Sequence, residues 1–294
     1  MNLKRLSISN LQQINELYRR CFQDQIEDDF FEWKYFSTFQ SETIVLGLFE
    51  GTQLIASGAL LYEVLLKDDK VLKTLRCTDL MTHPDYRGRG ASRKIAGGLN
   101  EFLAKSNVDV VYTMCSKIAT KSFFKTGWKF EKEIFYYFKP RFFSLFSSSI
   151  KDESKETSTL EAICKVYKLN YSNKAYLNFI KWRFANPKYK YYLISNEDEF
   201  IVYTINNNIL FVIDFKVNGF AFLKNLDKLV IENNYRGIVV LSSCSQIQNL
   251  KFSFLNGYLI NKFNFGPLKS LLDFNVLKEG ERFKDVYSIN YDDV

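Results

Sequence analysis

The chain has 294 residues, of which 47% are hydrophobic and 25% charged, as in soluble globular proteins with one large or two ordinary domains. The net charge of +7 is compatible with anionic ligands but too small to predict nucleic-acid binding, and the five scattered cysteines include no CxxC pair that would indicate zinc or a disulfide framework. We expect a cytoplasmic protein without a metal, because the N-terminus has no signal-peptide core and no run of about 18 apolar residues predicts a transmembrane segment.

The first 140 residues alternate between helical and strand patterns, each recognised from the spacing of its apolar residues. In chain order they predict a short strand at 3–8, helices at 11–23 and 28–37, two strands within 43–66 around a turn at Gly51, a strand at 73–83, a helix at 91–106, a buried strand at 108–115, a helix at 117–127 and the last strands at 128–139. This order predicts an α/β fold in which helices flank a central mixed sheet.

The second half of the chain repeats this pattern. Trp33 in "FFEWKYF" matches Trp182 in "FIKWRFANP", and Cys115 at the end of a buried strand matches Cys244. The interval between matching residues is shorter at the second match than at the first. The copy has therefore lost residues between Trp182 and Cys244.

A polar stretch rich in Ser, Lys and Glu, "SSSIKDESKETST", separates the two halves. It has almost no apolar residue that could anchor it in a core, so it is typical of a linker. We predict two domains of the same fold, at 1–142 and 159–294, with the linker at 143–158.

Between a strand and a helix, the first half carries "RGRGAS", residues 87–92. A helix N-terminus exposes unpaired N–H groups, while Gly88 and Gly90 can take positive φ and let the backbone approach a phosphate. Arg87 and Arg89 add cationic side chains. The sequence therefore predicts a pyrophosphate site, although the loop matches neither the Walker A nor the GxGxxG pattern. The second half has no such cluster at the corresponding place.

This loop resembles that of the GCN5-related N-acetyltransferase (GNAT) superfamily. Members carry [Q/R]-x-x-G-x-[G/A] after a strand that ends in a hydrophobic residue followed by x-Pro, as in "LMTHPDYRGRGAS". After the next strand, members often show Asn-x-x-Ala-x-x-x-Tyr-x-x-x-Gly-Phe. In those places this chain has Ser116, Ala119, Phe123, Gly127 and Trp128. The resemblance implies two GNAT-like domains in tandem, the second a degenerate copy that lacks the pyrophosphate loop.

The resemblance also implies acetyl-CoA or another acyl-CoA as the donor. Its pyrophosphate is expected on the loop, and its pantetheine arm along the strand edge before the loop, where the neighbouring parallel strand separates. A backbone N–H near Met81 is expected to stabilise the oxyanion. The expected cofactor-binding residues are Leu80, Met81, Thr82, Arg87, Gly88, Arg89, Gly90, Ala91, Ser92, Ser116 and Phe123.

Three positions depart from the family pattern. Ser92 replaces Gly or Ala, Ser116 replaces Asn, and Phe123 replaces a Tyr that protonates the leaving thiolate in many members. Because Phe cannot donate a proton, either another donor serves or the thiolate leaves unaided, as a thiol pKa of about 8.5 allows. Tyr136 is the expected donor, with Tyr112 and Tyr137 as alternatives, although each also fits a core aromatic residue.

The base, or the anchor for the acceptor amine, is expected to be Asp79 or Glu32. Members often carry Glu or His two or four residues before the position of Leu80, but Thr78 and Arg76 stand there. By strict alternation Asp79 faces the other side of the sheet, unless a bulge turns it inward. Glu32 belongs to a segment that lines the acceptor cleft in the family.

We therefore expect an enzyme of the N-acetyltransferase type that moves an acetyl group directly from acetyl-CoA to a small primary amine. An amino-sugar nucleotide of surface-polysaccharide synthesis is the first choice of acceptor, and a peptide or protein amine is the second. The alternative from another class is a non-catalytic acyl-CoA-binding sensor or scaffold. The second domain is expected to close one side of the acceptor cleft or to complete a homodimer.

Overall fold

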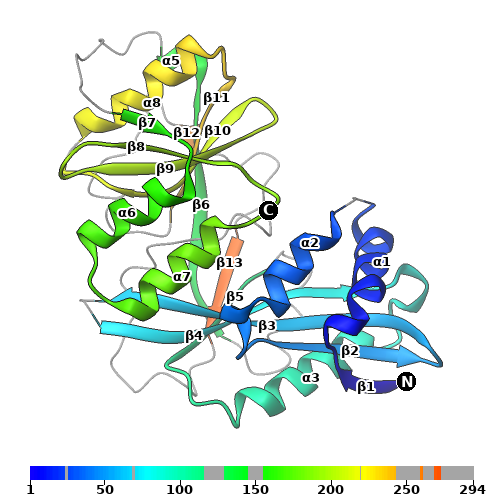
Figure 1. Ribbon diagram of the computed structural model, residues 1–294. Coiled ribbons are helices and arrows are strands. Elements are labelled where there is room, and N and C mark those ends of the chain that lie inside the picture. Colours follow the sequence, from blue (N-terminus) through cyan, green and yellow to red (C-terminus); the bar gives the residue numbers. More distant parts are fainter. Residues whose placement is uncertain are drawn as a thin grey trace.

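The computed structural model describes residues 1–23, 26–67, 70–115, 129–144, 155–218, 220–242, 259–260 and 268–272. It contains two mixed sheets flanked by helices, which confirms the predicted fold class (Figure 1). The two sheets are continuous with each other, because each strand is hydrogen-bonded to the next in the order β1-β2-β3-β4-β5-β13-β6-β11-β10-β9-β8-β7. Within these ranges, no helix is both long and apolar enough to cross a membrane.

The first sheet comes mainly from the first half of the chain. Its strands are β1 (Asn2–Arg5), β2 (Ile44–Glu50), β3 (Gln53–Lys67), β4 (Lys70–Thr82), β5 (Val110–Cys115), the first part of β6 (Lys129–Pro140) and β13 (Leu268–Leu272). Neighbouring strands are antiparallel except β4 and β5, which run parallel. A parallel pair needs a crossover, and α3 (Ala91–Leu103) provides it.

Helices cover both faces of the first sheet, with α3 on one side and α1 and α2 on the other (Figure 1). The second group consists of α1 (Leu11–Phe22), α2 (Asp28–Phe31) and the π-helical turn η2 (Glu32–Phe36), with short 3-10 turns at η1 (Ile8–Asn10) and η3 (Thr38–Gln40). The apolar spacing of α1 places Ile14 and Leu17 in the core. The helix predicted at 117–127 lies outside the described residues.

The second sheet repeats the same sequence of elements. Its strands are β7 (Lys155–Thr157), β8 (Tyr191–Ser195), β9 (Phe200–Asn206), β10 (Ile209–Lys216), β11 (Gly237–Ser242) and the second part of β6, with β12 (Leu259–Ile260) also beside β6. Its helices are α6 (Leu160–Asn170), α7 (Lys174–Phe184) and α8 (Phe220–Glu232). Among the described strands of this sheet, β10 and β11 form the one parallel pair, and α8 is the crossover helix between them, as α3 is between β4 and β5. The predicted repeat in sequence is therefore a repeat in architecture.

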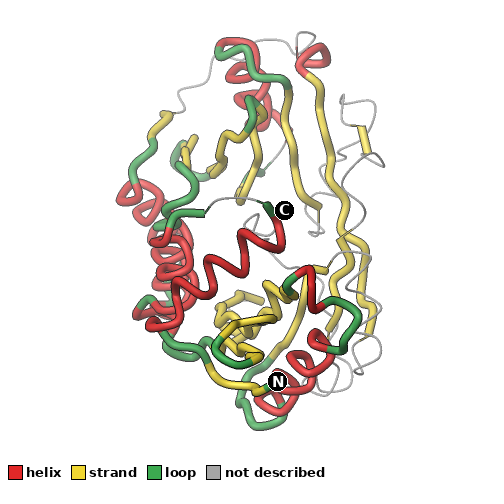
Figure 2. The backbone as a smooth tube through the Cα atoms, turned by 90° about the vertical axis from the view of Figure 1, so that its right-hand side faces the viewer, coloured by secondary structure: helices red, strands yellow, loops and turns green. Residues whose placement is uncertain are grey.

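The strand β6 belongs to both sheets. Its residues 129–134 pair with β13, and its residues 135–140 pair with β11. Figure 2 shows it as the long strand that connects the two ends of the molecule. Near its end, Lys139 forms a buried ion pair of 2.8 Å with Asp227 of α8. In return, β13 from the C-terminal part of the chain lies between β5 and β6 in the first sheet. Each sheet is thus completed by a strand from the other half of the chain.

This exchange bears on the predicted domain boundaries. Both α5 (Arg141–Ser144) and β7 reach into the predicted linker 143–158, and β7 pairs there with β8. The domain limits at 142 and 159 remain a prediction. A cut at those limits would separate β13 from the sheet that it completes.

The two tryptophans that reveal the repeat meet in space. The rings of Trp33 and Trp182 stack with centroids 4.8 Å apart and an angle of 10° between their planes. The indole Nε1 of Trp33 donates to the carbonyl of Trp182 at 2.8 Å, and Nε1 of Trp182 donates to the carbonyl of Trp33 at 3.1 Å. Such a reciprocal contact is the signature of a two-fold relation, here between two halves of one chain.

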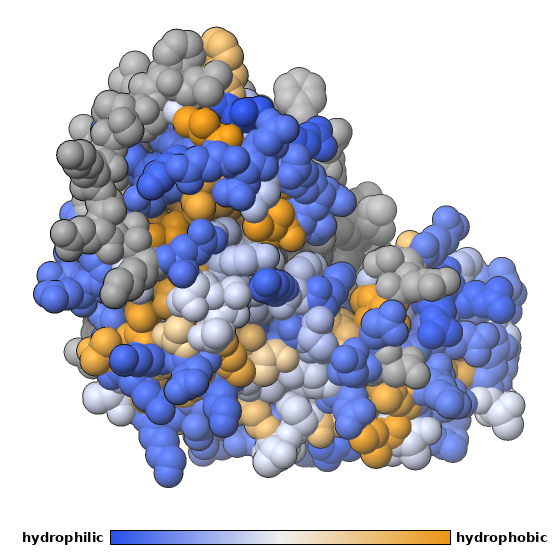
Figure 3. Space-filling model, turned by 45° about the horizontal axis from the view of Figure 1, so that its top comes forward, coloured by the Kyte–Doolittle hydropathy of each residue, from blue (hydrophilic) through white to orange (hydrophobic). Residues whose placement is uncertain are grey.

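The surface is mostly polar. In Figure 3, hydrophilic residues cover much of the visible face, and apolar residues form separate patches. Among the described residues, the exposed large apolar side chains are Met1, Leu3, Ile8, Phe22, Phe102, Phe142 and Leu169. They come from several elements in both halves, a scatter that is ordinary for a globular surface.

Candidate functional site

The RGRG loop joins β4 to the N-terminus of α3. The 3-10 turn η4 (Pro84–Tyr86) follows β4, and Gly90 is the N-cap residue of α3. Gly88 and Gly90 have φ of +77° and +79°, and a Cβ on either would meet no atom within 4 Å. The backbone conformation, rather than lack of space, therefore requires glycine at both positions.

The same loop presents positive charge. Arg87 and Arg89 are exposed, the Nε of Arg87 donates to the Thr82 carbonyl at 3.3 Å, and the Arg89 guanidinium lies 5.1 Å from the centre of the Tyr86 ring. The N-cap residue Gly90 makes no side-chain cap, so the first N–H groups of α3 receive no capping bond from it, and the two arginines directly precede them in the chain. This arrangement suits a phosphate or pyrophosphate group.

Beside the loop, β4 and β5 separate. Their parallel ladder ends at Cys77↔Thr113, whereas β4 continues to Thr82 and β5 continues to Cys115. The hydroxyl of Thr113 donates to the Cys77 carbonyl at 2.7 Å, which fixes the point where the strands part. The last five residues of β4 therefore have no described partner on the β5 side, as the resemblance implied.

A β-bulge interrupts β4 just before the loop. Ala59 pairs with Thr78 and Ser57 pairs with Met81, so two residues of β4 lie opposite Gly58. The first of them, Asp79, has φ of +51°, which is unusual for a residue other than glycine. The bulge considered in the sequence analysis is present.

The bulge directs Asp79 toward η2. Its Oδ2 lies 2.9 Å from the Nζ of Lys34 and accepts a hydrogen bond from the hydroxyl of Tyr35. Lys34 is 1% exposed, its Nζ lies 5.4 Å from the centre of the Phe30 ring, and the side chain of Asp79 is 12% exposed. A buried ammonium is stable in such a place because a carboxylate and an aromatic face both surround it.

A second buried network occupies the place where the family often has its base. The Nε of Arg76 lies 2.9 Å from Oε1 of Glu63, and the hydroxyl of Tyr112 donates to Oε2 of the same residue. All three residues are buried. Burial, followed by the charge of Glu63, raises the pKa of Tyr112 well above its ordinary value. Tyr112 is therefore a poor proton donor for a leaving thiolate.

The other two predicted catalytic residues belong to other elements than Asp79. Glu32 is the first residue of η2 and its side chain is exposed. The backbone of Tyr136 pairs with Leu241 of β11, in the part of β6 that belongs to the second sheet. Both remain predictions as catalytic residues.

The remaining predicted cofactor-binding residues follow the strand and the helix. A Cβ on Gly58 would lie 3.2 Å from Leu80 and next to Ile95, so Leu80 packs toward α3. Met81 and Ala91 are buried, and Ser92 is half-buried in the first turn of α3. Ser116 and Phe123 lie outside the described residues.

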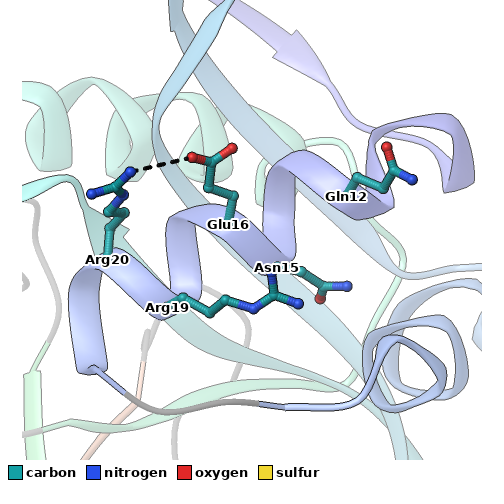
Figure 4. A pocket seen from close by; sticks show the side chains of 5 residues that line it. All are labelled: Gln12, Asn15, Glu16, Arg19 and Arg20. Atoms are coloured by element: carbon teal, nitrogen blue, oxygen red, sulfur yellow. Dashed lines mark ion pairs between the residues drawn. The ribbon is translucent and has the colours of Figure 1, made fainter.

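On the other side of the loop, α1 contributes polar side chains. A hollow of about 620 Å³ is lined by Gln12, Asn15, Glu16, Arg19 and Arg20 (Figure 4). Glu16 and Arg20 form an exposed ion pair at 3.7 Å. Burial raises the pKa of the Cys21 thiol, and the neighbouring charge of Arg87 partly offsets that rise. The C-terminal end of α1 therefore lies against the loop.

The second half contains a counterpart of the bulge but not of the loop. The register of β10 shifts between Val212 and Asp214, and the hydroxyl of Tyr167 donates to Oδ2 of Asp214. Burial raises the pKa of Asp214 to about 6 against the opposing effects of Tyr167 and the charge of Arg183. From the end of β10 at Lys216 to Phe220 of α8 there is space for three residues only, so no RGRG-like turn fits.

Sequence reasoning missed Lys34 and Tyr35 as partners of Asp79. A signal was present, because Lys34 follows Trp33 just as Arg183 follows Trp182. A cation at the same place in both halves, each near an aspartate of a bulged strand, indicates a repeated structural unit. The repeat was recognised from the tryptophans, but the residue after each was not interpreted.

Comparisons with known proteins identify the fold. Residues 2–130 match the family model described as "Acetyltransferase (GNAT) domain". No curated protein matches the chain. A probable N-acyltransferase of unknown function from Enterococcus faecalis V583 is similar in structure, with a TM-score of 0.65 and 12% identity over 92% of this chain and 71% of that chain.

Two further solved structures share the architecture. A GCN5-related N-acetyltransferase from Anabaena variabilis has a TM-score of 0.65 and 13% identity over 92% of this chain and 72% of that chain. A tandem GNAT protein from the clavulanic acid biosynthesis pathway has a TM-score of 0.63 and 10% identity over 92% of this chain and 97% of that chain. Residues 2–130 thus match the GNAT acetyltransferase domain family, and the whole chain has the fold of a tandem GNAT protein.

Proposed function

We propose that this protein is an acyl-CoA-dependent N-acyltransferase that transfers an acetyl group from acetyl-CoA to a primary amine. One observation carries the proposal: the glycines with positive φ and two exposed arginines lie at the N-terminus of α3, directly beside the opening between β4 and β5. This arrangement offers a phosphate site and an extended backbone edge next to each other, as acyl-CoA requires.

In this proposal the first domain binds the donor. The loop from Arg87 to Ser92 holds the pyrophosphate through backbone N–H groups and the two arginine side chains. The free edge of β4 from Leu80 to Thr82 offers its backbone groups to the amides of pantetheine. A backbone N–H near Met81 stabilises the oxyanion of the tetrahedral intermediate.

The reaction is a direct transfer. The amine nitrogen attacks the thioester carbonyl carbon, the C–N bond forms, the C–S bond breaks, and the proton lost by the amine ends on the thiol of CoA. Asp79 is the proposed contact for the amine, because the bulge brings it beside the edge of β4 that holds the donor. Glu32 of η2 and Tyr136 of β6 are secondary proposals for proton transfer.

For the acceptor we propose an amino-sugar nucleotide of surface-polysaccharide synthesis, with a peptide or protein amine as the second choice. The net charge of +7 favours an acceptor that carries phosphate. The second domain would close one side of the acceptor cleft, and its short β10–α8 connection argues against a second donor site. A cytoplasmic location and a homodimer remain predictions.

Calorimetry of acetyl-CoA with the purified chain tests the donor site. One site per chain is expected, and Arg89→Glu should weaken binding by about tenfold or more, because it replaces a charge-assisted contact with repulsion. Lys105→Glu is the matched control, since it makes the same charge change at an exposed position beyond the other end of α3. Equal binding by both variants would exclude the loop as the site.

A non-catalytic acyl-CoA sensor is the second candidate. The observation in its favour is that two acidic groups near the site, the buried Glu63 and the half-buried Asp79, both have cationic partners. Thiol release from acetyl-CoA with a panel of amino sugars, UDP-amino sugars and polyamines separates the two candidates. An enzyme releases CoA with at least one amine, whereas a sensor binds acetyl-CoA and releases none.

A further inference from the structure

Two unfavourable features coincide at the bulge of β4. Lys34 is almost completely buried, and Asp79 adopts a left-handed backbone conformation. Burying an ammonium and holding a residue other than glycine at positive φ each cost free energy, so a fold keeps both only where surrounding contacts enforce them. Lys34 and Tyr35 are adjacent residues of η2, and both point at the same carboxylate oxygen.

The two oxygens of Asp79 are in different situations. Lys34 and Tyr35 both contact Oδ2. Among the described residues none donates to Oδ1, and the side chain keeps 12% of its surface open. An ionised carboxylate has several acceptor sites and no donor, so Oδ1 can receive only a group that carries N–H or O–H.

We infer that Lys34 and Tyr35 are positioning residues, which fix the carboxylate of Asp79 through Oδ2 so that Oδ1 is directed at an N–H of the acceptor amine. This inference rests on the proposed function. It deepens that function by naming the two side chains that orient the proposed contact for the amine.

The second half supplies a natural comparison. Arg183 follows Trp182 as Lys34 follows Trp33, and its charge acts on Asp214. There, however, both oxygens are occupied: Tyr167 donates to Oδ2, and the backbone N–H of Phe215 donates to Oδ1 at 2.8 Å. Both carboxylate oxygens of Asp214 thus accept hydrogen bonds within the second half, whereas in the first half only Oδ2 of Asp79 has a described partner. A ligand contact is therefore assigned to Asp79 and not to Asp214.

The test measures amine-dependent thiol release from saturating acetyl-CoA by the full chain, with glucosamine and spermidine as probes. Lys34→Met keeps the apolar stem but removes the charge. Its KM for the amine should rise by about fivefold or more, because a carboxylate that is no longer fixed at Oδ2 contacts the amine less well. Tyr35→Phe should raise this KM by less, and acetyl-CoA binding should stay within about twofold in both variants.

Two further variants separate positioning from stability. Lys34→Arg should restore most of the wild-type KM for the amine, because an arginine occupies the equivalent place in the second half. Arg183→Met removes the equivalent buried cation, so it should lower the melting temperature and leave this KM unchanged.

The outcomes are distinct. An unchanged KM for the amine in Lys34→Met, or the same rise in Arg183→Met, would overturn the inference. So would a wild-type protein that binds acetyl-CoA and turns over no primary amine. If acetyl-CoA itself fails to bind, the proposed function fails, and the inference fails with it.

Discussion

The two halves of this chain share one architecture and differ in two places. Each has a strand, two helical segments, three strands, a crossover helix and a further strand, with a bulge in the strand before the crossover. The first half has a long hairpin, with strands of 15 and 13 residues, and an eight-residue connection that contains the RGRG turn. The second has a hairpin with strands of 7 and 8 residues and a three-residue connection.

This difference separates what the fold needs from what a ligand needs. The second half keeps the sheet, the crossover and the buried cation near a bulge aspartate without a phosphate loop, so these features are sufficient for structure. Among the described residues, the RGRG loop and a bulge aspartate with one carboxylate oxygen that has no partner, Oδ1 of Asp79, occur in the first half alone. The fold does not require them, so we attribute both to the binding of a ligand. Most of the length that the second half has lost lies in the hairpin.

The largest expected effect concerns the strand exchange between the halves. Deletion of residues 259–294 removes β13, which lies inside the first sheet although it belongs to the C-terminal part of the chain. Loss of an internal strand exposes unpaired edges on both β5 and β6. We expect the truncated chain to lose its cooperative urea transition and its acetyl-CoA binding together. Retention of both would show that the first half folds without β13.

The next effect concerns the reciprocal tryptophan contact. Trp182 is buried, and Trp182→Ala should lower the free energy of unfolding by about 3 to 5 kcal/mol. The double variant with Trp33→Ala should show a coupling of about 0.5 to 3 kcal/mol in urea denaturation, because the two side chains touch each other. Phe22→Ala, at an exposed position, serves as the control and should change stability by less than about 0.5 kcal/mol. Strictly additive tryptophan variants would mean that the halves do not stabilise one another through this contact.

A third effect is the pH dependence of stability that comes from Asp214. Burial raises its pKa from 3.8 to about 6 in the folded protein. Between these values the folded state keeps a proton that the unfolded state has lost, so stability falls as the pH rises from about 4 to about 6, by up to about 3 kcal/mol. In Asp214→Asn this fall should disappear from urea denaturation curves recorded across the range. A variant with the same fall as the wild type would contradict the buried site.

The smallest expected changes in stability come from a matched pair of glycine substitutions, one in the loop and one in α3. Gly90→Ala forces a Cβ into a φ of +79° and should cost about 1 to 2 kcal/mol and weaken acetyl-CoA binding. Gly97 lies within α3 with open space around it and no positive φ, so Gly97→Ala should stabilise the protein by about 0.5 to 1 kcal/mol and leave binding unchanged. Thermal unfolding and calorimetry of both variants give the comparison. Equal behaviour of the two would show that the backbone conformation at Gly90 has no role in binding.

The sequence by itself determined the features that depend on neighbouring residues. Apolar spacing predicted the helices and strands, the RGRG loop predicted an anion site at a helix N-terminus, and the two tryptophans predicted a repeat. Each of these signals is local, because side-chain periodicity and positive φ are properties of a few consecutive residues. For this reason the fold class and the loop could be predicted without coordinates.

The tertiary structure alone decided how distant segments meet. A sequence pattern does not encode whether a strand bulges, so it left the direction of Asp79 open, and the contact with Lys34 and Tyr35 depends on packing between η2 and β4. The exchange of β6 and β13 likewise depends on long-range pairing, for which either half offers similar strands. Strand register and the pairing of buried charges are set by the whole fold, because their free energy depends on which groups surround them once water is excluded.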